Sequence, residues 1–458
     1  MKLWVWLFNL ACAAALAQQN PTIGENSQKY LIDLIRLDTS NPPGNESRVA
    51  HYLKRIVEAQ GIACELLGDD PKRMNFVARL KGSGEGGRPL LLMAHSDVVP
   101  ADRKQWTVDP FSAAIKEAYI YGRGATDTKN LLSAELAVFL ELKRKNVKLK
   151  RDVIFLSEAD EEAGSLGIQW LIKNAYSKID AEFAINEGGS AAETASKTRM
   201  FQIQTTEKIP TRVILSAHGT AGHGSLPRAD NAVVHLARAI TRLSEADQPV
   251  RLNTTTRRYL SELAKLTDYQ WLQPQLSKLE SDSSSATAAN EIREHETELA
   301  AILRTTVSPT MLSAGMKINV IPNSAEAQVD VRRLPNETQQ EVLARFRRIV
   351  NDPSVDVNPA PGQEMPATEP SSLTTVLYKA MEQMFLVSAK KAIVVPLMSR
   401  GATDGAFLRQ KGMAVYGAPI FLRDGRESRS HGNDERIGLE NLSHGTALLW
   451  TIVNAVAQ

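Results

Sequence analysis

The sequence predicts an α/β fold that is interrupted by a ferredoxin-like α+β unit. Two observations predict it. Buried-strand runs alternate with helical patterns towards both ends of the chain, and a βαββαβ order lies between them. The length of 458 residues is too great for one compact core, so we expect two folded domains.

Three near-continuous apolar runs predict strands of a sheet that is covered on both faces. These runs are Pro89–Ala94, Asp152–Leu156 and Ala181–Ile185. Helical patterns lie between them, over Asn130–Lys143 and over Ser165–Tyr176. Each run is followed by polar residues. In such a sheet, polar residues just past the strand ends line the ligand crevice.

Residues 208–362 predict a second unit with a ferredoxin-like order of elements. In chain order these are a strand over Thr211–Ala217, a helix over Asn231–Leu243, strands over Thr310–Ile321 and Ala325–Leu334, a helix over Thr338–Val350 and a strand over Val355–Asn358. A polar and mostly helical insertion is expected at 250–305. The α/β pattern then resumes, so residues 18–207 and 363–458 are expected to form one domain around the second.

Charge and the N-terminal segment limit the class of protein. The 54 basic and 52 acidic residues leave a net charge of +2, which predicts no binding of nucleic acid or of an anionic membrane. The apolar run Leu3–Leu16 and the Ala15-Leu16-Ala17 site predict an export signal, residues 1–17, with cleavage after Ala17. The run is too short for a comfortable membrane span. We therefore expect a secreted or periplasmic protein without stable membrane insertion, with an uncleaved anchor as the alternative.

Cleavage of this signal would leave Cys64 as the single thiol of the chain. An exported protein with one thiol has no internal disulfide. Any metal site must therefore use nitrogen and oxygen ligands.

Histidines and acidic residues gather where the predicted strands and other elements end: His95, Asp97, Asp127, Asp160, Glu161, Glu162, Glu187 and His431. Taken singly, each has a simpler reading as a turn residue, a helix cap or a surface histidine. The three consecutive acids after the second strand repel one another, and a multivalent cation removes that repulsion. Such ligands suit zinc-like cations, and two metals about 3.5 to 4 Å apart need a bridging carboxylate. Six of these residues, in the chain order His, Asp, Glu-Glu, Glu and His, supply five ligands and a spare acid for proton transfer.

The ordered motifs resemble the co-catalytic zinc peptidases, a family that includes glutamate carboxypeptidase, acetylornithine deacetylase, succinyl-diaminopimelate desuccinylase and the aminoacylases. The motifs are His95–Pro100, Trp106–Phe111, Tyr121–Asn130, Asp160–Gly164, Gly222–Pro227, Thr403-Asp404 and Ser430–Arg436. The resemblance covers nearly the whole chain from Ile32 onward. It implies a zinc-exopeptidase-like catalytic domain with a mixed central sheet flanked by helices, interrupted by a ferredoxin-like lid or dimerisation domain.

The resemblance also implies the ligands of two divalent metal ions. It gives His95 and Glu187 to one ion and Glu162 and His431 to the other, with Asp127 as the bridge. The expected ion is Zn²⁺, with Co²⁺ and Mn²⁺ as alternatives.

By the same resemblance, Asp97 orients the imidazole of His95 by accepting its second N–H. Glu161 is the general base. His223 stabilises the oxyanion of the intermediate, often from the neighbouring subunit. The positions that match substrate-binding residues are Asn319, Arg332, Gly401 and Thr403.

The predicted function is an exported carboxypeptidase or dipeptidase that cleaves a peptide bond next to a free carboxylate. The alternative is an N-acyl-amino-acid hydrolase. A non-catalytic binding protein of the same fold has no need of Glu161, and a phosphoesterase would need a basic phosphate cradle that the sequence lacks. The sequence departs from the family pattern at Thr128–Asn130 and at Arg400, and Arg400 leaves the local shape of the pocket open. The long insertion leaves both a monomer and a homodimer open.

Overall fold

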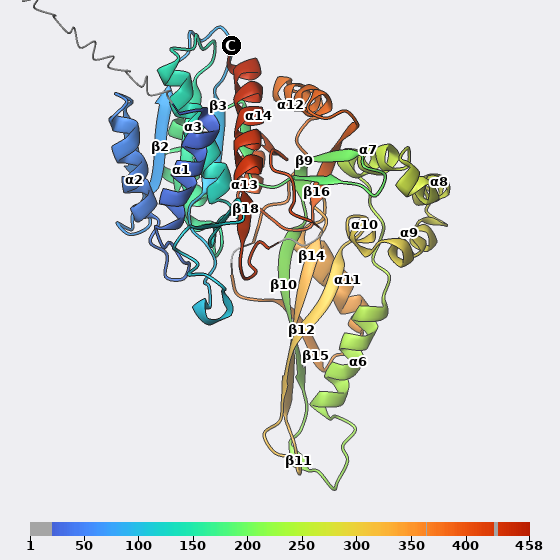
Figure 1. Ribbon diagram of the computed structural model, residues 1–458. Coiled ribbons are helices and arrows are strands. Elements are labelled where there is room, and N and C mark those ends of the chain that lie inside the picture. The colour runs from blue at the N-terminus through green and yellow to red at the C-terminus, as the bar shows by residue number, and fades with distance from the viewer. Residues whose placement is uncertain (1–20, 363, 426–428) are drawn as a thin grey trace, which may run out of the picture.

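The computed structural model describes residues 21–362, 364–425 and 429–458. The predicted export signal, residues 1–17, lies outside this range. The chain forms an α/β body from which an elongated lid extends, as Figure 1 shows. None of the helices in the described part of the chain is long and apolar enough to cross a bilayer.

The centre of the body is a nine-stranded sheet in the order β1-β2-β6-β3-β7-β17-β9-β16, with β8 paired to β9. Its strands are β1 (Cys64–Leu67), β2 (Asn75–Leu80), β3 (Leu90–His95), β6 (Val153–Glu158), β7 (Phe183–Asn186), β8 (Ser190–Glu193), β9 (Arg199–Glu207), β16 (Ala392–Ser399) and β17 (Ala414–Gly417). Strands β6, β3, β7 and β17 run parallel, whereas β1, β2 and β8 pair antiparallel. The predicted α/β fold with a mixed sheet is therefore confirmed.

Both faces of this sheet are covered, which explains the near-continuous apolar runs. Leu90 and Leu92 of β3 point into one core, whereas Leu91 and Met93 point into another. The first core is closed by α2 (Ser47–Glu58), α3 (Lys129–Arg144), α12 (Val376–Val387) and α14 (Leu439–Ala457), and α1 (Ile23–Ile35) packs on α3 and α14. The second core is closed by α4 (Leu166–Asn174), α5 (Tyr176–Ile179) and α13 (Gly405–Gln410). Truncating Leu92, which is fully buried, to Ala would cost about 2 to 5 kcal/mol.

The lid contains four antiparallel strands in the order β12-β14-β10-β15, which is the ferredoxin-like arrangement. Its elements are β10 (Ile209–His218), α6 (Ala232–Glu245), β12 (Thr306–Ala314), β14 (Ser324–Arg333), α11 (Gln339–Val350) and β15 (Val355–Pro359). Helices α6 and α11 cover one face through an apolar cluster. At the free end of the lid, β11 (Gly222–His223) pairs with β13 (Val320–Ile321) (Figure 1).

The strand predicted over Thr310–Ile321 differs from the observed one. Strand β12 begins earlier, at Thr306, and ends at Ala314. Gly315 then adopts a φ of 66°, in the left-handed region that glycine tolerates, and turns the chain. Residues 315–319 form a loop before the short strand β13.

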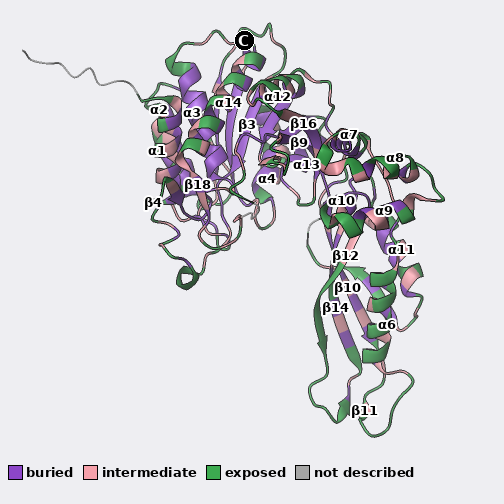
Figure 2. Cartoon of the chain, turned by 45° about the vertical axis from the view of Figure 1, so that its right-hand side comes forward, coloured by how far each residue is buried: buried purple, intermediate pink, exposed green. Residues whose placement is uncertain are grey.

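The insertion consists of α7 (Thr254–Leu263), α8 (Gln273–Leu279), α9 (Ser285–His295) and α10 (Thr297–Ala301), with a 3₁₀ turn before α8. Its apolar side chains pack on Met200 of β9 and on Val395 and Met398 of β16. The insertion thus covers the outer strands of the body, and most of β12 in the lid stays exposed (Figure 2).

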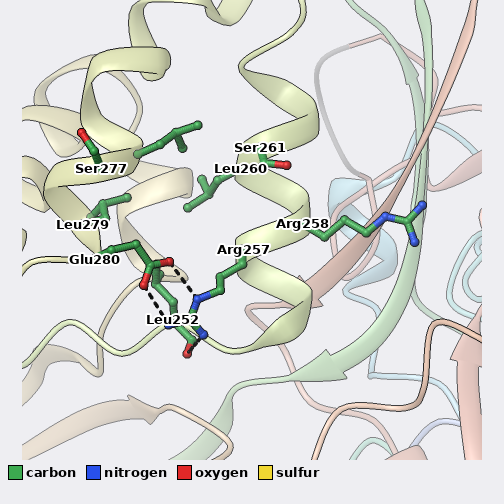
Figure 3. A pocket seen from close by; sticks show the side chains of 9 residues that line it. Leu252, Arg257, Arg258, Leu260, Ser261, Ser277, Leu279 and Glu280 are labelled. Carbon is green, nitrogen blue, oxygen red and sulfur yellow. Dashed lines mark hydrogen bonds and ion pairs between the residues drawn. The ribbon is translucent and has the colours of Figure 1, made fainter.

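A groove of about 470 Å³ lies between α7 and α8, floored by leucines such as Leu260 and Leu279. Figure 3 shows Arg257 and Glu280 paired at its edge, with N–O distances of 2.8 and 3.0 Å. None of its lining residues belongs to the predicted metal site. Because the groove lies on the insertion and shares no residue with the metal site, we assign it no part in the chemistry.

Candidate metal centre

The parallel strands bring their carboxyl ends, and the loops that follow them, to one edge of the sheet. His95 is the last residue of β3, and only 1% of its surface is exposed. Its Nδ1 lies 2.9 Å from the Asp97 carbonyl oxygen, so Nδ1 carries a proton. Its Nε2 faces Asp127 Oδ1 at 3.2 Å and Glu187 Oε2 at 3.5 Å. A lone pair that faces two carboxylates requires either a second proton or a cation between them.

Asp127 links the two histidines. Its Oδ1 faces His95, and its Oδ2 lies 3.2 Å from Nε2 of His431. His431 in turn lies 3.1 Å from the Glu162 carboxylate. One carboxylate oxygen directed at each histidine is the arrangement that a carboxylate bridging two cations needs.

The ligand atoms form two overlapping groups that share His95. In one group the atoms of His95, Asp127 and Glu162 lie within 4.8 Å of one another, and in the other those of His95, Glu161 and Glu187 do. The five residues to which the family resemblance gives metal-ligand roles therefore meet at one place. Glu161 lies close enough to ligate as well, so the geometry alone does not separate its role from that of the ligands.

The electrostatics of the cluster also favour bound cations. Burial and the neighbouring Glu187 raise the pKa of Glu161, and burial raises the pKa of Glu187. Hydrogen bonds with Asp127 and Glu162 raise the pKa of His431 to about 10. Burial opposes the ionisation of Asp127, but its bonds to His431 and His95 lower its pKa. Positive charge between the carboxylates relieves this repulsion, and the all-nitrogen and oxygen donor set suits zinc-like ions.

Asp97 lies beside His95, as its predicted orienting role requires, and it has further partners. The His95 Nδ1 donates to the Asp97 carbonyl at 2.9 Å, and the nearer carboxylate oxygen lies 3.5 Å from the same nitrogen. The carboxylate also accepts the backbone N–H groups of Glu161 at 3.2 Å and Glu162 at 3.1 Å, and the amide of Asn41 at 2.8 Å. Asp97 thus holds the loop that carries both glutamates.

The predicted substrate residues lie in two places, some near the junction of lid and body and the others at the free end of the lid. Arg332 lies near the end of β14 that adjoins the body, where it pairs with Asp330 at 3.0 Å. Gly401 and Thr403 follow β16, and Thr403 donates to Glu207 at 3.0 Å.

His223 and Asn319 lie instead at the free end, around β11 and β13, where the Gly224 N–H donates to the Asn319 carbonyl (Figure 1). The structure of one chain therefore does not bring His223 and Asn319 to the metal centre.

Sequence reasoning missed several buried partners of the site. Asn41 donates to both Asp97 and Asp160, at 2.8 and 2.9 Å. Beneath the ligands, burial raises the pKa of Glu158 and raises that of Asp404 to about 7. Asp404 belongs to a motif that the sequence shows, but nothing in the sequence indicates that it lies beside Glu158.

Comparisons with known proteins agree with this geometry. A model of peptidase family M20/M25/M40 matches residues 91–455. The human N-fatty-acyl-amino acid synthase/hydrolase PM20D1 is 31% identical over 79% of this chain and 72% of its own length. A probable carboxypeptidase S-like 2 of Dictyostelium discoideum is 28% identical over 80% of this chain and 71% of its own.

Solved structures share the fold. An M20 family metallo-carboxypeptidase from Sulfolobus solfataricus superposes with a TM-score of 0.68 at 23% identity, covering 94% of this chain and 99% of that one. A dinuclear metal-binding M20 peptidase of Bacillus subtilis has a TM-score of 0.58 at 15% identity, covering 95% and 97%. The resemblance seen in the motifs is therefore confirmed. The family model spans most of the chain, and its metal-dependent chemistry has a matching cluster of ligands here, so the chain belongs to peptidase family M20/M25/M40 and is a metal-dependent hydrolase of peptide or amide bonds.

Proposed function

We propose that this chain is an exported hydrolase with two Zn²⁺ ions that cleaves the amide bond preceding a free α-carboxylate. The observation that carries the proposal is the position of Asp127, which directs one oxygen to His95 and the other to His431. Export rests on the predicted signal, residues 1–17. It favours the degradation of external peptides or acylated amino acids over biosynthesis.

The residues divide between the ions as the family resemblance implies. His95 and Glu187 would hold one ion, Glu162 and His431 would hold the other, and Asp127 would contribute to both. When bound, such ions polarise the scissile carbonyl and lower the pKa of attacking water. Co²⁺ and Mn²⁺ accept the same donors.

Glu161 is the proposed general base. Its side chain lies among the ligands, and its backbone N–H is held by Asp97 at 3.2 Å. Its pKa is raised by desolvation and by Glu187, and a carboxylate of this kind is suited to take a proton from water and return it to the leaving amine.

The substrate carboxylate is proposed to bind Arg332, beside Gly401 and Thr403. Arg332 lies at the junction of lid and body, pairs with Asp330 on its own strand and keeps 37% of its side chain exposed. A guanidinium in this state can grip a carboxylate through two parallel hydrogen bonds.

His223 and Asn319 are proposed to reach the centre of a second subunit, which makes the protein a homodimer. The supporting observation is edge strand β12. Within the described part of the chain no strand pairs with its outer side, and Met311 and Leu312 are 59% and 68% exposed. An unpaired edge strand with apolar side chains is a template for pairing with another strand.

The group on the acyl side of the bond separates two candidates. If the acyl group is a peptide or an amino acid, the protein is a carboxypeptidase or dipeptidase. The Dictyostelium relative is named as a probable carboxypeptidase. A fatty acyl group makes the present protein an N-acyl-amino-acid hydrolase. The 31% identity to the human N-fatty-acyl-amino acid synthase/hydrolase supports this second candidate specifically.

The test is mass spectrometry of dipeptides, longer peptides and N-acyl amino acids, incubated with the purified mature protein with and without a chelator. Chelator-sensitive release of a C-terminal residue supports the peptidase, and release of an amino acid from its acyl group supports the second candidate. Substrates whose α-carboxylate is amidated serve as the matched control and should remain intact. Equal cleavage of these amides would contradict recognition of the carboxylate.

A further inference from the structure

We propose that Glu435 is a positioning residue that holds the loop of Asp127 and the loop of His431 in one fixed arrangement; the inference rests on the proposed two-metal function. Glu435 is fully buried and directly precedes β18 (Arg436–Gly438). That strand pairs with β5 (Tyr119–Tyr121), which leads into the Asp127 loop. Two chain segments more than 300 residues apart are thereby placed side by side.

The Glu435 carboxylate accepts hydrogen bonds from five donors on the Asp127 loop. Its Oε1 accepts the Thr126 N–H at 2.7 Å, the Thr126 hydroxyl at 2.9 Å and the Asp127 N–H at 3.0 Å. Its Oε2 accepts the Gly124 N–H at 3.0 Å and Nη1 of Arg123 at 2.8 Å. The loop therefore wraps around a single anion.

Arg123 extends this contact to the other loop. Its Nη2 lies 3.4 Å from the His431 carbonyl oxygen, and its guanidinium lies 5.2 Å from the centre of the Trp106 ring. The arginine is 2% exposed. The buried Arg123–Glu435 pair thus joins the backbone of the bridging ligand to the backbone of a terminal ligand.

Glu435 acts through Asp127 and not on the metals directly. Asp127 turns its backbone N–H towards Glu435 and its carboxylate towards His95 and His431. Both oxygens of Glu435 are occupied by donors of the loop. Groups that orient metal ligands in this way typically contribute about 10 to 100-fold to metal affinity.

The substitution Glu435→Gln keeps the shape but leaves one acceptor oxygen in place of two. Whichever way the amide turns, its NH₂ faces N–H donors, either those around Oε1 or those around Oε2. A buried donor without an acceptor is unfavourable, so the loop relaxes and Asp127 loses its alignment. We expect the dissociation constant for Zn²⁺ to rise about 10 to 100-fold.

The experiment measures Zn²⁺ dissociation constants by chelator competition, with Co²⁺ absorption spectra as a second readout of ligand geometry. The matched control is Glu337→Gln. Glu337 is 1% exposed and pairs with Arg345 at 2.8 Å in the lid. This control should lose stability while binding Zn²⁺ within about twofold of the wild type. The milder variant Thr126→Val, which removes one donor, covers the case in which Glu435→Gln does not fold, and should weaken binding by about threefold or more.

Several outcomes would overturn the proposal. One is Zn²⁺ affinity and a Co²⁺ spectrum unchanged in Glu435→Gln, or in Thr126→Val when the first variant does not fold. Another is an equal loss of affinity in the Glu337→Gln control. Both leave the proposed function intact, since they require a wild type that binds metal. A wild type that binds no Zn²⁺ would instead remove the proposed function, and the inference with it.

Discussion

Replacing Asp97 by Asn tests whether the Asp97 carboxylate fixes the loop that carries Glu161 and Glu162. The carboxylate accepts from the N–H groups of Glu161 and Glu162, one on each oxygen, and from the Asn41 side chain. An asparagine has one acceptor oxygen. In either orientation its NH₂ faces the N–H of Glu161 or of Glu162, so at least one donor loses its acceptor.

The expected loss of unfolding free energy follows from the number of donors that lose their acceptor. Asp97 is fully buried, so no water replaces the lost acceptor, and one unsatisfied donor costs about 1 to 3 kcal/mol of unfolding free energy. The same loop carries the metal ligand Glu162. Metal binding must therefore restore its position, which lowers the affinity about 10 to 100-fold.

Urea denaturation and chelator competition measure the two quantities separately. Asp152→Asn is the control, because Asp152 also accepts a backbone N–H, that of Gly82 at 2.9 Å, but away from the metal centre. It should lose stability alone. Unchanged metal affinity in Asp97→Asn, with stability lowered as in the control, would refute the reasoning and leave Asp97 with a structural role only.

Four further predictions concern three residues around the metal centre and lid and one buried lysine. Glu161→Gln should keep both metal ions and lower kcat about 10² to 10⁴-fold; loss of one ion by elemental analysis would make Glu161 a ligand. His431→Ala should lower the bound metal, and a full complement would contradict its role as ligand. His223→Ala should keep the metal and lower kcat about 10² to 10³-fold. If the histidine acts across a dimer, mixing this variant with Glu161→Gln should restore activity, because one mixed active site then has both residues. No recovery in mixed dimers would contradict a role for His223 in the partner's active site. Burial lowers the pKa of Lys208 to about 7 from its ordinary 10.5, so the unfolded chain binds more protons between these values and unfolding free energy should rise with pH across that window. Lys208→Met should flatten this slope in denaturation curves, and an unchanged slope would assign it to other groups.

Much of the fold could be predicted because its signals are local. The apolar runs that became β3, β6 and β7 are continuous in the sequence, and both of their faces are buried. The order of strands and helices in the lid could also be predicted from the sequence. The end of β12 was not predicted, since a single Gly315 turn decides it.

By itself the sequence determined that His95, Glu162 and Glu187 could meet at the sheet edge, since β3, β6 and β7 run parallel and these residues lie at or just past their ends. It also carried the motifs that identify the family. Only the tertiary structure decided how those ligands are supported. The partners of Asp97 and the donors around Glu435 come from loops far apart in the chain, and the distant position of His223 follows from the extended lid. Hydrogen bonds between distant segments depend on packing geometry, which no local pattern of residues encodes.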